Sequence, residues 1–191
     1  DEWSEVYPTI ERNIRCPKFE QREFRVTKYG ASPSKSAAKN QKAINAAIAA
    51  CSKAGGGRVV ISGGTFRTGA IRLLSNVNLV IAEGDTLLFV FDPKLYPIVP
   101  TRWEGIDCNN LSPCIYAYEA ENVALTGNGV VDGGASNDAW WPWNGKAEYG
   151  YVDGTPCQKS PGARPKLLQM AEDGVDMSER IFTAAECLRP Q

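Results

Sequence analysis

From residue 58 onward, the sequence consists of short β-rich runs separated by Gly, Asn and Asp. The runs occupy residues 58–62, 65–74, 77–82 and 86–91. Such runs, bounded by turn-forming residues, predict strands joined by tight turns. Both a two-sheet sandwich and a solenoid of stacked strands are built from elements of this kind.

A weak internal repeat favours the solenoid. The segment Asn-Val-Asn-Leu beginning at Asn76 resembles Asn-Val-Ala-Leu beginning at Asn122, and the offset is 122 − 76 = 46 residues. Each turn of a stacked repeat of this kind takes roughly 20 to 25 residues. We therefore expect the two segments to lie two turns, or rungs, apart.

One amphipathic helix is expected before the first strands. Residues 39–54 carry apolar side chains at helical spacing, and three glycines, 55–57, end the pattern. Open strand edges invite pairing with other chains, so a solenoid needs an element that covers its first rung. The helix is predicted to be that cap.

The strand pattern stops after Asp132. Residues 133–164 are rich in Gly, Pro, Trp and Lys and predict a long excursion, followed by a helical turn or two within 166–172. Loops longer than about 15 residues are uncommon in compact domains and are usually functional or disordered.

The overall composition excludes several classes of protein. The formal charge is −1, from 21 basic and 22 acidic side chains, and no long run of like charges occurs, so a nucleic-acid partner is not expected. The longest apolar run, 87–91, is far shorter than the roughly 20 residues that cross a bilayer, so no membrane partner is expected either.

Six cysteines and no histidine are present. No C-x-x-C pair occurs, so a metal site is not expected. Cys108 and Cys114 could close a short disulfide loop, but buried free thiols are an equally good interpretation.

Several motifs in the chain are distinctive. They are Lys28-Tyr29-Gly30-Ala31, Val59-Val60-Ile61, Gly64-Thr65-Phe66, Leu74-Ser75-Asn76-Val77-Asn78-Leu79 and Gly127-Asn128-Gly129-Val130-Val131-Asp132-Gly133. With these motifs the sequence resembles glycoside hydrolase family 28, the polygalacturonases. Four more motifs resemble the bacterial exo-polygalacturonases of that family: Tyr96-Pro97, Thr101-Arg102-Trp103-Glu104-Gly105, Ser112-Pro113 and Trp140-Trp141-Pro142-Trp143.

The resemblance implies an all-β fold, a right-handed parallel β-helix of the pectin lyase-like type with an N-terminal capping helix. Residues 1–23 would be an N-terminal extension, and residues 24–191 the cap and first rungs, incomplete at the C-terminus. The implied activity is hydrolysis of α-1,4-linked galacturonic acid in pectin, exo-acting and inverting, in a secreted or periplasmic enzyme that needs no cofactor. The implied partners are pectin or an oligogalacturonide and the remaining C-terminal rungs of the same protein.

The catalytic signatures of the family are absent from this sequence. They are an Asn-Thr-Asp segment, an Asp-Asp pair, a Gly-His-Gly segment and an Arg-Ile-Lys segment, and none occurs among the 191 residues. We therefore assign no catalytic residue. The acids near predicted turns are candidates by position alone: Asp92, Glu104, Asp107, Asp132 and Asp138. Asp132, in a Val-Asp-Gly turn, is better explained as a turn residue.

Five residues are candidate substrate-binding residues. Arg102, Trp103 and Glu104 lie in a predicted loop, and a guanidinium can hold a uronate carboxylate through two hydrogen bonds. Trp140 and Trp141, in the excursion, could stack on sugar rings. The alternative is structural: Arg102 and Glu104 would pair with each other or with neighbours, and at least two of the excursion's tryptophans would anchor it to the body.

Other functions on the same fold remain open at this point. A non-catalytic carbohydrate-binding β-helix would keep the tryptophans without catalytic acids. A polysaccharide lyase or a rhamnogalacturonan hydrolase would share the scaffold and differ in chemistry.

Overall fold

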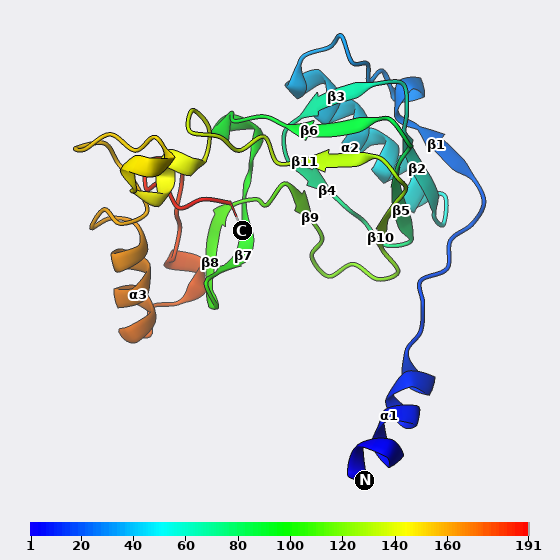
Figure 1. Ribbon diagram of the computed structural model, residues 1–191, viewed down its shortest axis with the longest axis horizontal. Helices are drawn as coiled ribbons and strands as arrows, with labels where there is room; N and C mark the ends of the chain where they lie inside the picture. The colour runs from blue at the N-terminus through cyan, green and yellow to red at the C-terminus, as the bar shows by residue number, and fades with distance from the viewer. Residues whose placement is uncertain (191) are drawn as a thin grey trace.

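The computed structural model describes residues 1–190 (Figure 1). The α-helices are α1 (Glu2–Asn13), α2 (Ala37–Lys53) and α3 (Arg164–Glu172), and the 3-10 helices are η1 (Val26–Tyr29), η2 (Pro93–Leu95), η3 (Trp141–Asn144), η4 (Ala147–Tyr149) and η5 (Met177–Glu179). The strands are β1 (Glu23–Arg25), β2 (Gly57–Ile61), β3 (Thr65–Thr68), β4 (Ile71–Arg72), β5 (Val77–Ile81), β6 (Thr86–Phe89), β7 (Ile98–Trp103), β8 (Ile106–Leu111), β9 (Ile115–Tyr116), β10 (Ala124–Thr126) and β11 (Val130–Asp132).

Three of the four sheets are parallel. One runs in the order β1-β2-β5-β10, a second in the order β11-β6-β3, and the third pairs β4 with β9. Consecutive strands along the chain therefore enter different sheets, and each sheet is assembled from strands far apart in sequence. Figure 1 shows these strands stacked on one side of the molecule. The predicted strands are confirmed, and pairing between them is parallel.

The spacing of the rungs differs from the expectation. Arg58 pairs with Asn78, an offset of 78 − 58 = 20 residues, whereas Asn78 pairs directly with Ala124, an offset of 124 − 78 = 46 residues. The two similar segments are thus neighbours and not two rungs apart. The expectation was wrong because about half of the longer offset is an insertion that contributes no strand to this sheet.

That insertion contains an antiparallel hairpin, β7 with β8, in a region predicted to be a loop. Trp103 pairs with Ile106, which leaves a two-residue turn in which Glu104 has φ 47° and Gly105 has φ 90°. Two central residues with positive φ match the twist of antiparallel strands. Together with three α-helices, this hairpin means that the all-β expectation holds only in part.

Helix α2 supplies one wall of the main core. Ile44, Ala47 and Ile48 are fully buried against strand residues such as Val59 and Leu79. Each large side chain buried in this way contributes roughly 1.5 to 3 kcal/mol. The helix predicted over 39–54 is confirmed, and its burial against the first strands is the packing expected of a cap.

A second core forms around the hairpin. Trp103 of β7 and Leu167 of α3 are buried with Phe182 and Leu188 of the following segment. Tyr96, Leu111 and Trp143 belong to a third cluster that includes Ala70, next to β4. The hairpin, α3 and the excursion therefore form a second body beside the parallel strands (Figure 1).

Helix α1 stands apart from both bodies (Figure 1). None of its residues is buried, and Trp3 and Tyr7 are largely exposed. The segment that follows is tied to the strand stack at Lys18, whose backbone N–H donates to Asn122 Oδ1 at 3.0 Å and whose carbonyl accepts from Asn122 Nδ2 at 2.7 Å.

All six cysteines are free thiols. The disulfide considered between Cys108 and Cys114 is not formed, and Cys108 is fully buried. Among residues 1–190, no helix combines the length and the apolar character that a bilayer crossing requires.

Candidate functional site

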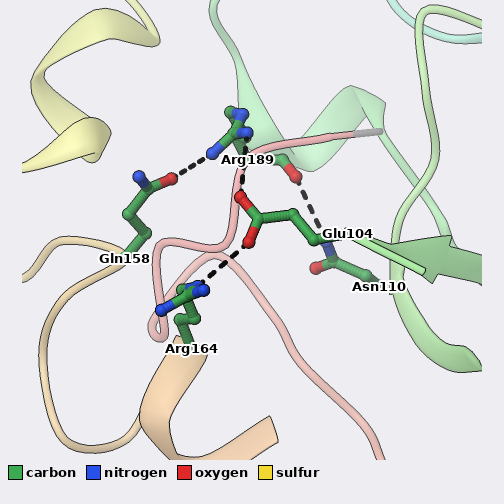
Figure 2. Close-up of polar contacts among 5 residues, drawn as sticks. All are labelled: Glu104, Asn110, Gln158, Arg164 and Arg189. Carbon is green, nitrogen blue, oxygen red and sulfur yellow. Dashed lines mark hydrogen bonds and ion pairs between the residues drawn. The ribbon is translucent and has the colours of Figure 1, made fainter. Parts of the chain in front are cut away.

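Glu104, at the tip of the β7–β8 hairpin, binds two arginines (Figure 2). Its Oε2 lies 3.0 Å from Nε of Arg164, the first residue of α3, and its Oε1 lies 3.5 Å from a guanidinium nitrogen of Arg189. One carboxylate thus joins the hairpin, α3 and the C-terminal segment.

Arg189 is held from three further directions. Its guanidinium lies over the ring of Trp103, 5.1 Å from the centroid, and donates a short hydrogen bond to Gln158 Oε1. Asn110, a fully buried residue of β8, donates to the backbone carbonyl of Arg189 at 3.3 Å (Figure 2). The position of this guanidinium is therefore set before any ligand arrives.

The three predicted loop residues do not share one surface. Arg102 pairs with Asp107 at 2.9 Å in an exposed ion pair, Trp103 is 1% exposed, and Glu104 faces the two arginines. Trp103 has no free face for a sugar ring. The pairing of Arg102 and Glu104 with neighbours follows the structural alternative raised from the sequence.

The tryptophans of the excursion divide into two roles. Trp140 contacts Phe91 and Tyr96 edge-on, with ring centroids 4.7 Å and 5.1 Å away, and Trp143 is buried beside it. Trp141 is 45% exposed and meets Tyr149 at 6.0 Å. Two tryptophans anchor the excursion, as expected, and the third presents its ring to solvent.

A pocket of about 720 Å³ lies between the excursion, the end of β11 and the C-terminal segment. Its lining includes Trp140, Trp141, Asn144, Lys146, Tyr149, Lys159 and Arg189. The volume is within the range of small-molecule sites, roughly 300 to 1,000 Å³. The structure thus brings Trp140 and Trp141 to one cavity and leaves Arg102, Trp103 and Glu104 outside its lining.

Sequence reasoning missed five of these residues: Asn144, Lys146, Tyr149, Lys159 and Arg189. They come from separate parts of the chain and form no local motif. For the four that lie in the excursion, the available signal was its composition, where lysines occur among tryptophans and glycines.

Three of the acids near turns, Asp92, Asp107 and Asp132, use their carboxylates in local contacts. Asp132 Oδ1 accepts from the N–H of Gly134 at 2.8 Å, as expected of a turn residue, and Asp92 Oδ1 accepts from the N–H of Lys94 at 3.1 Å. Asp107 binds Arg102, and Asp138 lies in a turn where its N–H donates to Ser136 Oγ at 3.2 Å.

A solved structure resembles this chain over nearly its whole length. A hyperthermoactive exopolygalacturonase from Thermotoga maritima is 39% identical over 98% of this chain, with a TM-score of 0.90. A family 28 exopolygalacturonase from Yersinia enterocolitica is 30% identical over 60% of this chain and 21% of its own, with a TM-score of 0.52. The chain resembles the family 28 polygalacturonases.

The similarity covers only part of the length of the polygalacturonases. The chain spans 41% of the length of the Thermotoga enzyme. A polygalacturonase from Erwinia carotovora ssp. carotovora, 24% identical over 72% of this chain and 37% of its own with a TM-score of 0.53, supports the fold alone. No protein-family model and no curated protein matched the sequence.

Proposed function

We propose that this chain is the N-terminal part of a pectin-degrading glycoside hydrolase that cleaves α-1,4-galacturonosyl bonds of polygalacturonate. One observation carries the proposal: 39% identity and a TM-score of 0.90 to an exopolygalacturonase over 98% of the chain. Because the chain covers 41% of that enzyme, the activity belongs to the longer protein.

The proposed scaffold is a right-handed parallel β-helix in which α2 caps the first rung. Two features support it. The same sequence of strands recurs, with β2 and β3 followed by β5 and β6 and then by β10 and β11, and each set pairs in parallel with the previous one. In this proposal residues 1–23 are an extension, and residues 24–191 form the cap and first rungs.

The proposed reaction is exo-acting and inverting. An inverting glycosidase needs an acid and a base carboxyl group about 6.5 to 9.5 Å apart, with a water between them. We assign that pair to the remaining C-terminal rungs, because this sequence contains none of the catalytic signatures of the family. The excursion, anchored by Trp140 and Trp143, would close one end of the substrate cleft.

The decisive experiment is digestion of polygalacturonate by the full-length protein, with products separated by anion-exchange chromatography. Release of galacturonate or digalacturonate from the earliest time points is expected, with an inverted anomer by NMR. Early appearance of long oligomers would overturn exo action, and an unsaturated product would identify a lyase. The 191-residue chain alone should release no sugar.

We also propose that the enzyme is secreted to the periplasm or the medium and that it needs no added cofactor. Polygalacturonate is too large to enter a cell intact, so the enzyme has to meet it outside the cytoplasm. Activity retained after dialysis against a chelator, together with recovery of the protein in the periplasmic or extracellular fraction, is the expected result.

A further inference from the structure

Helix α1 presents an apolar stripe to solvent. Five apolar side chains form it, and each is between 44% and 66% exposed: Trp3, Val6, Tyr7, Ile10 and, at the C-cap of the helix, Ile14. Apart from Val6 they follow one another at spacings of four, three and four residues, which is the spacing of a coiled-coil seam. The rings of Trp3 and Tyr7 lie next to each other, with centroids 5.6 Å apart.

Helix α1 is too short to be stable without a packing partner. It has 12 residues, none of them buried, and Pro8 lies inside it. Isolated helices shorter than about 12 to 15 residues are marginal in water, and an internal proline removes one backbone hydrogen bond. The N-cap bond, in which the N–H of Trp3 donates to Asp1 Oδ1 at 3.1 Å, contributes only about 1 kcal/mol. Packing of the apolar stripe is therefore the interaction that can hold this helix.

The two ends of this segment carry opposite charge. The acids come first and the bases last, with Glu11 between them: Asp1, Glu2 and Glu5, then Arg12, Arg15 and Lys18. None of the ion pairs among residues 1–190 includes these side chains. Two such helices side by side attract when they are antiparallel, because each acidic end then lies beside a basic end and the helix dipoles oppose each other. A parallel pair would bring like charges together.

From these features we propose that the apolar stripe of α1 packs antiparallel against the same stripe of a second copy of this chain. In a register where Tyr7 meets Ile10 of the second copy, Trp3 meets Ile14 of that copy, since 7 + 10 and 3 + 14 are equal. Every contact of a two-fold pair is made twice. Figure 1 shows α1 extending away from both bodies, so a second copy can reach the stripe. The inference does not depend on the proposed function.

The test is sedimentation velocity of the full-length protein over a range of micromolar concentrations. A pair of short helices is smaller than a standard interface, so we expect a weak dimer that dissociates on dilution. A monomer at every concentration would overturn the proposal, and this includes the case in which another part of the longer protein covers α1.

A substitution at the centre of the stripe locates the contact. Tyr7→Ser should weaken dimerisation at least about tenfold, because large side chains at the centre of an interface contribute most of its affinity. Val152→Ser removes a 66% exposed apolar side chain from the excursion and should leave dimerisation unchanged. A dimer that persists unchanged in the Tyr7→Ser variant contradicts the proposal.

Charge reversal tests the orientation and the identity of the partner. The variant Glu2→Lys/Glu5→Lys and the variant Arg12→Glu/Arg15→Glu should each dimerise more weakly than the unmodified protein, because each brings like charges together in an antiparallel pair. Mixed in equal amounts, the two variants should form a heterodimer in preference to either homodimer, which native mass spectrometry distinguishes by mass. Recovery on mixing also shows that α1 still folds in both variants. Absence of the heterodimer would refute pairing between copies.

The parallel alternative gives a different result in the same experiment. A parallel pair already places like charges side by side, so reversing the charge of one end would leave its strength nearly unchanged. Unweakened homodimers of both variants would therefore contradict the antiparallel arrangement.

Discussion

The guanidinium of Arg189 lies over the indole ring of Trp103, 5.1 Å from its centroid, and so joins the C-terminal segment to strand β7. The contact combines a cation–π attraction with the ion pair to Glu104. The ring beneath it is 1% exposed, and its Nε1 has no acceptor. Trp103 is therefore part of the support for Arg189 and not a surface for ligand.

We predict that Glu104→Gln lowers the free energy of unfolding by about 1 kcal/mol. The variant loses two ion pairs, but the three side chains are 37% to 48% exposed, so solvent screens them. Urea unfolding at low and high salt measures the loss, which should shrink as salt rises. Arg102→Gln, which breaks a pair with more exposed side chains, is the control and should cost less; a larger loss there would contradict the network described around Glu104.

Gly127→Ala is predicted to be far more destabilising than Gly84→Ala. Both glycines have positive φ, 103° and 79°, but an added Cβ at Gly127 would lie 2.0 Å from the carbonyl oxygen of Ile81, whereas the space around Gly84 is open. We expect a loss of about 1 kcal/mol at Gly84 and roughly 3 kcal/mol or more at Gly127. Chemical unfolding of the two variants checks this, and similar losses would argue against the close stacking of the turn after β10 on β5.

Asn40→Ala should cost about 2 to 3 kcal/mol. The side chain is fully buried, its Oδ1 accepts from the N–H of Ser32 at 2.9 Å, and its Nδ2 donates to the carbonyl of Arg67 at 3.1 Å. Truncation leaves both backbone groups without this partner. Lys39→Ala, on the exposed face of the same helix, controls for helix propensity and should change stability by less than about 0.5 kcal/mol; thermal unfolding compares the two.

A thiol reagent should modify one cysteine of the native protein much faster than the other five. Cys16 is exposed and Cys157 is buried. Burial raises the pKa of Cys51, Cys108, Cys114 and Cys187 and so keeps these four thiols protonated near pH 8. Because the thiolate is the reactive form, a raised pKa slows labelling. Mass spectrometry should show one rapid modification in the native protein and six after denaturation. Rapid modification of a second thiol would show that the segment around it opens.

Local pattern made the strands and the capping helix predictable. The helix expected over 39–54 is α2, and the runs beginning at 58, 77 and 86 are β2, β5 and β6, because alternating and helical periodicities reflect burial directly. The hairpin was missed because Pro100 disfavours a strand and because Glu104 is an unusual residue for a turn with positive φ.

The candidate site was harder to predict for a different reason. Trp141 could be selected from its residue type, but Lys159 and Arg189 meet it through tertiary packing that no local spacing encodes. Glu104 is predicted to bind substrate, and the structure shows that its carboxylate pairs with two arginines 60 and 85 residues away (164 − 104 and 189 − 104), which no local pattern indicated.

Strand pairing between β2, β5 and β10 stays in phase although one connection spans 20 residues and the next spans 46. The connections between the strands can therefore differ in length without disturbing the strand pairing. The connection between β6 and β10 already carries the β7–β8 hairpin. A foreign peptide grafted into this connection would be held at a defined position beside the parallel strands, which makes the connection a suitable place for engineering new recognition.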